Sequence, residues 1–300
     1  GIEMTLNTVN IDKSGFQWRS NFVFSLNRNK VLSLDTESAT IDKTFQVGSD
    51  KMTVTRTVVG KPIGQLYGYK VIGRFDKAED FYYKDAEGNV KPVALPEGVT
   101  INKNGAWIGD YNFYDKNGDG VINTSDCDFI GNPQPDFTYG IGNTFSWKGF
   151  DLSIFFSGSY GNDVLNANRL FFESGWNKAR ELNQFASYAD RWTEDNPYSD
   201  IPRATASSSN RVFSSRVIED GSFLRLKTLT LGYTVPKKLL TRFRIDNLRV
   251  YFAAQNLWTL TNYSGYDPEV SIRNSALTPG LDFSAYPRAR QFSFGVSLGF

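Results

Sequence analysis

The last ten residues of the chain, 291–300, alternate between large apolar side chains and small or polar ones. Successive side chains of a β-strand point to opposite faces of a sheet, so this alternation predicts a strand with one apolar face and one polar face. The apolar face consists of Phe292, Phe294, Val296, Leu298 and Phe300. This face needs a nonpolar environment, whereas the other face tolerates water.

The same alternation occupies two consecutive segments, 137–147 and 150–160, which are separated only by Lys148 and Gly149. A two-residue connection between alternating segments predicts an antiparallel hairpin. Each segment is as long as a tilted strand that crosses a bilayer, which needs about 9–11 residues. Aromatic side chains lie near both ends of the apolar stripe, as in the interfacial girdles of membrane barrels. The hairpin can therefore span a membrane.

Five further segments have strand patterns, so the sequence predicts seven strands. In one of these segments the alternation is blurred around Arg225 and Lys227. The segment 62–75 also has an extended pattern, and it could belong either to the main sheet or to an external hairpin. The five segments are 2–10, 16–28, 222–235, 247–258 and 289–300.

The connections between these strands alternate in length. The short ones lie near 11–15, at Lys148-Gly149 and at 236–246, and the long ones at 29–136, 161–221 and 259–288. Short turns on one side and long loops on the other are typical of outer-membrane barrels. We therefore predict an all-β fold, an antiparallel transmembrane β-barrel, with the long connections as extracellular loops. An antiparallel sandwich with an aromatic core is the water-soluble alternative.

The strand number also predicts that the barrel is incomplete. Seven strands place the two ends of the chain on opposite sides of the membrane, whereas single-chain bacterial barrels have an even number of strands. We interpret residues 1–300 as the C-terminal segment of a larger barrel whose N-terminal part is absent from this chain.

The composition excludes several classes of function. Aromatic residues make up 15% of the chain, which is more than a soluble domain ordinarily has to bury. The net charge of +1 gives no indication of a nucleic-acid partner. The chain has no His and one cysteine, Cys127, so disulfide frameworks, thiolate zinc sites and most hydrolase constellations are excluded. We expect that the chain is not an enzyme.

One segment, 115–126, has the spacing of a calcium-binding loop. Gly120 occupies the position of the sharp turn, but Asp126 replaces the usual final Glu, and the flanking sequence does not predict paired helices. We expect a calcium ion that staples an external loop; an Asn/Asp/Gly turn without metal is the alternative. The predicted Ca²⁺ ligands are Asp115, Asn117, Asp119, the main-chain carbonyl of Val121, Asn123 and Asp126.

Four blocks in order resemble a known family. They are DKNGDGVIN with IGNPQPDFTYGIGNTFSWKGFDLSIFFSGSYGNDV, then SFLRLKTLTLGYTVP, then LRVYFAAQNLWTLTNYSGYDPEV, and finally YPRARQFSFGVSLGF. From about residue 100 to residue 300 the chain resembles the C-terminal barrel half of SusC/RagA-type TonB-linked (TonB-dependent) outer-membrane transporters, and the resemblance before that is looser.

The resemblance implies a barrel of about 22 strands filled by an N-terminal plug that has no counterpart in this chain. It also implies a SusD-like surface lipoprotein as a lid, TonB as the source of energy, and import of oligosaccharide or peptide nutrients across the bacterial outer membrane. The terminal Phe300 resembles the C-terminal aromatic signal that the barrel-assembly machinery reads, and the apolar strand faces would contact the lipid bilayer.

Three rival functions remain open from the sequence: a soluble or surface-anchored calcium-binding β module, an outer-membrane enzyme and a passive porin. The substrate-binding residues are unknown. Aromatic residues of the long loops could stack on sugar faces or pack within the loops; they are Trp107, Tyr111, Trp176 and Trp192.

Overall fold

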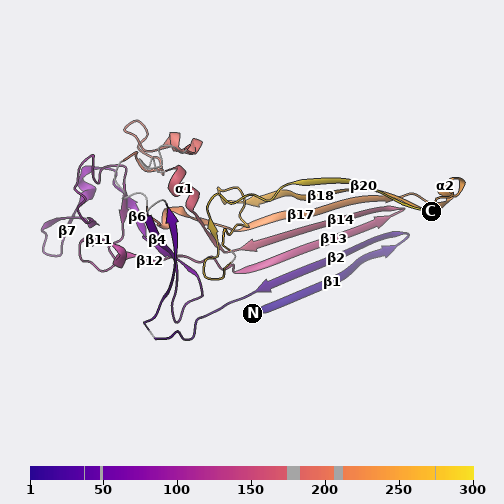
Figure 1. Cartoon of the computed structure of the whole chain (residues 1–300), viewed down its shortest axis with the longest axis horizontal. Helices are drawn as coiled ribbons and strands as arrows, with labels where there is room; N and C mark the ends of the chain where they lie inside the picture. The colour runs from indigo at the N-terminus through magenta and orange to yellow at the C-terminus, as the bar shows by residue number, and fades with distance from the viewer. Residues whose placement is uncertain (37, 48–49, 174–182, 206–211, 274) are drawn as a thin grey trace.

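The computed structural model describes residues 1–300 except 37, 48–49, 174–182, 206–211 and 274. It has two parts (Figure 1): one long antiparallel sheet, and a body of small sheets and short helices at one end of it. The body is formed by the three long connections, 29–136, 161–221 and 259–288, and is called the loop body below.

All seven predicted strands are present, and they form one sheet in the order β1-β2-β13-β14-β17-β18-β20. Neighbouring strands are antiparallel throughout. Within the described residues β1 and β20 are the two outer strands and do not pair with each other, so the sheet is open. The strands are β1 (Ile2–Lys13), β2 (Phe16–Leu26), β13 (Phe137–Trp147), β14 (Phe150–Tyr160), β17 (Phe223–Thr234), β18 (Asn247–Thr261) and β20 (Gln291–Gly299).

The strand register joins the apolar faces of the separate strands into one surface. Phe145 pairs with Trp18 on one side and with Leu152 on the other. Directly paired residues point to the same face of a sheet, so the alternation of each strand continues across its neighbours. This surface is not a soluble core, because Phe294 and Val296 expose 82% and 63% of their area. A sandwich would bury them.

The opposite face is rich in Ser, Thr and Gly, and it holds large side chains only where the facing residue is small. A Cβ added to Gly295 would lie 2.2 Å from the ring of Tyr251, its direct cross-strand partner. No real Cβ can approach a ring so closely, so this position requires glycine. On the same face the Arg249 guanidinium pairs with the Asp151 carboxylate at 2.6 Å.

The blurred alternation of the fifth strand has a structural cause. The register shifts between Leu226 and Thr228 on the β18 side, and between Phe155 and Phe156 on the β14 side. Such a β-bulge inserts one extra residue into a strand. Arg225 is the cross-strand partner of Ser157, and Lys227 lines the same pocket as Ser157. Both cations therefore lie on the polar side of the sheet.

The loop body consists of short sheets in which distant segments pair. The segment 62–75 forms β5 and β6, which pair within this body, so it is not part of the long sheet. The strands are β3 (Ile41–Val47), β4 (Asp50–Thr57), β5 (Gln65–Gly68), β6 (Val71–Arg74), β7 (Tyr82–Lys84), β8 (Val90–Pro92), β9 (Leu95–Pro96), β10 (Tyr111–Phe113), β11 (Val121–Ile122), β12 (Asp128–Gly131), β15 (Asp163–Asn166), β16 (Ile218–Asp220) and β19 (Leu281–Asp282).

The buried core of the molecule lies in the loop body rather than against the long sheet. Leu66, Leu165 and Leu281, one from each long connection, belong to the same buried cluster. Helix α1 (Ala167–Phe172) packs into this cluster with Leu170 and Phe171. The three connections therefore fold as one unit.

The opposite end of the sheet carries only short connections and is called the turn end below. Its largest feature is the helical turn α2 (Lys237–Leu240), followed by the 3₁₀ turn Thr241–Phe243, between β17 and β18 (Figure 1). None of the helices in the described part of the chain is long and apolar enough to cross a membrane.

Candidate functional site

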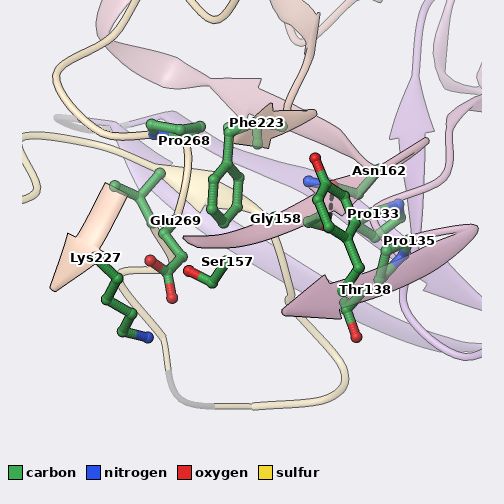
Figure 2. A pocket seen from close by; sticks show the side chains of 15 residues that line it. Pro133, Pro135, Thr138, Ser157, Gly158, Asn162, Phe223, Lys227, Pro268 and Glu269 are labelled. Atoms are coloured by element: carbon green, nitrogen blue, oxygen red, sulfur yellow. Dashed lines mark hydrogen bonds between the residues drawn. The ribbon is translucent and has the colours of Figure 1, made fainter. Parts of the chain in front are cut away.

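A pocket of about 400 Å³ lies where the loop body meets the polar face of the sheet (Figure 2). The sheet contributes Ser157 from β14 and Phe223 and Lys227 from β17, and the loop body contributes Pro268 and Glu269. Figure 2 shows the side chains of these residues around the pocket, so the site is formed jointly by the strands and by the connection 259–288.

A charged network fastens this connection to the sheet. Arg225 is almost fully buried; its Nη2 lies 2.5 Å from Oδ1 of Asp267, and its Nη1 lies 3.3 Å from Oε2 of Glu269. Arg288 pairs with the other oxygen of Glu269 at 3.1 Å. Removing one partner of a buried ion pair leaves an uncompensated charge and costs about 3–5 kcal/mol. The network thus positions Glu269 at the pocket.

Asp267 is held in its charged form by this network. Burial alone would raise the pKa of Asp267, but the Arg225 guanidinium opposes that effect, together with the backbone N–H groups of Glu269 and Arg288. The pKa of Asp267 therefore lies below its usual value.

The pocket has polar atoms that the chain itself does not satisfy. Among the described side chains that line it, the Oγ of Ser157 and, apart from its ion pair with Arg225, the Oε2 of Glu269 are buried without a hydrogen-bond partner. A buried polar atom without a partner costs about 1–3 kcal/mol, and a polar ligand or water that bonded to it would remove that cost. With an ammonium group at Lys227 and a carboxylate at Glu269, the pocket can bind a polar group. It contains no arrangement of nucleophile and base.

The predicted calcium loop folds compactly. Gly118 and Gly120 adopt positive φ angles, and their N–H groups donate to the two carboxylate oxygens of Asp115 at 2.7 and 2.9 Å. Asp119 accepts from the N–H of Val121 at 2.8 Å. Asp115 and Asp119 line a hollow of about 740 Å³ together with residues of β8 and β10.

The last predicted ligand, Asp126, already has two backbone partners. Its side chain is fully buried and accepts from the N–H of Lys116 at 3.0 Å and from that of Asn123 at 2.7 Å. These bonds tie the two ends of the loop together. In the described part of the chain, no three side chains of His, Cys, Asp or Glu converge as a metal-binding group. A carboxylate oxygen that accepts one hydrogen bond retains a lone pair, so the donor set still has the chemistry for Ca²⁺.

The loop aromatics that the structure describes pack within the loop body. Trp107 stacks near Phe81, with ring centroids 6.3 Å apart, and Trp192 lies so close to Gly109 that an added Cβ would meet its ring at 2.4 Å. The hydroxyl of Tyr111 donates to the carbonyl of Asp200 at 2.6 Å. Trp176 lies outside the described residues.

A second aromatic hollow was not predicted from the sequence. Its volume is about 510 Å³, and its lining includes Phe172, Phe185, Tyr266 and Tyr286. Tyr286 exposes 92% of its area. The two tyrosines lie in an irregular connection without periodicity, so no local pattern distinguishes them from other loop residues.

Phe300 directly follows β20 and exposes 88% of its area. It lies at the turn end of the sheet, near α2 (Figure 1). Lys227 and Glu269 of the pocket, and Arg225, which pairs with Glu269, were not predicted as site residues either. The blurred alternation at Arg225 and Lys227 was the one signal of them in the sequence.

Comparison with known proteins gives the following similarities. The chain is 34% identical over 307 residues to TonB-dependent receptor P3 and 34% identical over 310 residues to TonB-dependent receptor P26, both of Formosa agariphila. It is 26% identical over 303 residues to TonB-dependent receptor SusC of Bacteroides thetaiotaomicron. These alignments cover 100% of this chain but 28%, 29% and 26% of the relatives. No family model matches the chain.

Among solved structures, the RagAB peptide transporter matches with a TM-score of 0.72 and 24% identity. The match covers 99% of this chain and 28% of that chain. The RagAB peptide importer in its closed-closed state matches with a TM-score of 0.70 and 23% identity over 99% of this chain and 29% of that chain. At this level of identity the similarity shows a shared fold.

Proposed function

The whole chain is homologous to a segment, about 28% in length, of SusC/RagA-type TonB-dependent receptors, and from this premise we propose that it forms the C-terminal part of the barrel of an outer-membrane importer. This is a family of transporters rather than enzymes, which agrees with the expectation from composition. The observation that carries the proposal is the single apolar surface across seven strands, which remains exposed at residues such as Phe294.

In this proposal the apolar surface contacts lipid and the polar face lines the interior of the barrel. The outer strands β1 and β20 would pair with strands from the rest of a longer protein, which would also supply the plug; together they would make a barrel of about 22 strands. The loop body would then lie outside the cell, because short turns of such barrels face the periplasm and long loops face outward.

The substrate would be an oligosaccharide or a peptide, captured under a SusD-like lipoprotein lid and released inward with energy from TonB. The solved relatives are described as a peptide transporter and importer, which supports a nutrient-import function. The pocket of Figure 2 supports binding of a polar ligand, because its unsatisfied atoms, Lys227 and Glu269 offer both donors and acceptors.

The test is made on the full-length parent protein, purified in detergent from outer membranes. We expect a surface lipoprotein to co-purify in stoichiometric amount, as identified by mass spectrometry, and the complex to bind oligosaccharides or peptides. A protein that is water-soluble without detergent and has no lipoprotein partner would overturn the proposal in favour of a calcium-binding β module.

We further propose that the loop 115–126 binds a structural Ca²⁺ ion. The six predicted ligands would hold it: Asp115, Asn117, Asp119, the carbonyl of Val121, Asn123 and Asp126. The backbone bonds of Asp126 would also keep the ends of the loop together. The ion would supply charge neutralisation for the carboxylates of an exposed loop.

Calcium should slow proteolysis of this loop in the EDTA-treated parent protein, and the double variant D115A/D119A should lose that protection. The matched control is Asp85→Ala, because Asp85 also accepts backbone N–H groups, from Glu87 and Asn89, but lacks the calcium spacing. Equal protease sensitivity with and without millimolar Ca²⁺ would contradict the proposal.

A further inference from the structure

The turn between β17 and β18 is the most cationic segment of the turn end. Residues 236–246 contain four basic side chains and one acidic side chain, Asp246. All four cations are exposed. In the part of the chain that the structure describes, none of them enters an ion pair, whereas Arg225, Arg249 and Arg288 of the same sheet and its connections do. The four are Lys237, Lys238, Arg242 and Arg244.

The same turn exposes two large apolar side chains. Leu239 exposes 64% of its area and Phe243 exposes 68%, while Leu240 between them is buried and anchors the turn. A short helical turn that presents both Lys/Arg and Leu/Phe to its surroundings has the composition of segments that lie in a membrane interface.

The turn between β13 and β14 also combines a cation with exposed apolar side chains. Trp147 and Phe150 flank the Lys148-Gly149 turn, each about half exposed, and the Lys148 ammonium lies 4.9 Å from the centre of the Trp147 ring. Phe150 packs against Tyr233 of β17 at 4.5 Å between ring centroids. The aromatic residues therefore run from one turn to the next at the level where the apolar face of the sheet ends.

We propose that the segment 236–246 is a docking surface for anionic phospholipids, with its cations on the lipid phosphates and Leu239 and Phe243 inserted among the acyl chains. The proposal rests on the membrane orientation proposed above. A lipid surface is the partner that matches both features at once, because cations are attracted to an anionic membrane and apolar side chains gain from leaving water.

The surface would fix the depth at which the sheet sits in the bilayer. The turn that contains α2 and the turn between β13 and β14 lie at the same end of the sheet, so one lipid layer can contact both (Figure 1).

The test uses the full-length parent protein in detergent, with phosphatidylglycerol and phosphatidylethanolamine added in equal amounts, and counts retained lipids by native mass spectrometry. We expect the variant K237Q/K238Q/R242Q/R244Q to retain phosphatidylglycerol at least roughly tenfold more weakly than the wild type. Added salt should weaken the wild-type binding and leave that of the variant unchanged.

The matched control neutralises four exposed lysines of the loop body, K30Q/K51Q/K84Q/K103Q, and should retain phosphatidylglycerol like the wild type. A second variant, L239S/F243S, should bind both lipids more weakly. Heat-modifiable migration on gels reports folding for every variant; where the fourfold variant misfolds, the pairs K237Q/K238Q and R242Q/R244Q should each show a partial loss.

The outcomes separate the two proposals. A folded, detergent-requiring receptor whose fourfold variant retains phosphatidylglycerol as the wild type does would overturn the lipid-docking surface alone. A parent protein that is soluble without detergent would overturn the importer proposal, and the docking surface with it.

Discussion

Asn143 is a polar residue within the apolar face of the sheet. Its Oδ1 accepts hydrogen bonds from the Nε1 of Trp18 at 2.9 Å and from the Oγ of Ser20 at 2.7 Å, and Ser20 in turn accepts from Asn10 at 2.6 Å. In lipid, where no water can replace a lost partner, such groups must satisfy one another. Removing the acceptor of this network therefore tests whether this face of the sheet lies in lipid or in water.

We expect Asn143→Ala to lower the stability of the folded parent protein by about 1 kcal/mol, because two donors lose their acceptor. Loss of the heat-modifiable form on heating in detergent measures this change. Thr144→Ala is the control, since Thr144 points to the polar face and is exposed. Equal effects of the two substitutions would mean that water reaches both faces.

Asp267 decides how the connection 259–288 responds to acid. Its folded pKa is depressed, so its contribution to stability is complete above the unfolded value near 3.8 and is lost as pH falls through the lower folded value. We expect hydrogen exchange in 259–288, corrected for intrinsic rates, to rise below about pH 4.

The substitution Asp267→Asn should raise hydrogen exchange in 259–288 at pH 7 in the same way. It should lower the free energy of local opening by about 3 kcal/mol, because Arg225 then loses its closest carboxylate. Asp246→Asn, at the opposite end of the sheet, should leave exchange in this connection unchanged. Wild-type exchange rates in the Asp267 variant would contradict the role assigned to the network.

At the scale of elements, the strands were predictable because alternation is a local property. A period of two assigns each residue to a face without knowledge of its neighbours, and the observed β2, β13 and β14 begin where the pattern begins. The bulge at Arg225 and Lys227 blurred the pattern, since an extra residue shifts the phase of a strand.

The assignment of the two faces predicts opposite outcomes for adjacent substitutions. Ile154→Lys places a charge on the apolar face, which we propose contacts lipid, and should destabilise the proposed barrel by about 2–4 kcal/mol. Ser153→Lys points to the polar face and should have little effect. The amount of heat-modifiable receptor in outer membranes measures both. Equal loss from the two variants would show that the face assignment is wrong.

At the scale of the whole molecule, the long sheet has two unpaired outer strands, β1 and β20. Exposed strand edges pair with other chains and lead to aggregation. We expect residues 1–300 expressed alone to aggregate and to give no heat-modifiable species on gels, and the parent protein to give one. A stable, monodisperse product from the 300-residue chain would contradict the proposed partnership with further strands.

The sequence alone determined the seven strands, their two faces, the alternating lengths of the connections and the calcium-like loop. Each of these features depends on residues that are close together in the sequence. The tertiary structure decided where the long connections go. Arg225 meets Asp267 across 42 positions, and the hydroxyl of Thr55 donates to the carbonyl of Leu277 across 222. Contacts between residues so far apart depend on how the long connections pack against one another. The periodicity of neighbouring residues in the sequence does not encode them. The pocket between sheet and loop body is the product of those pairings.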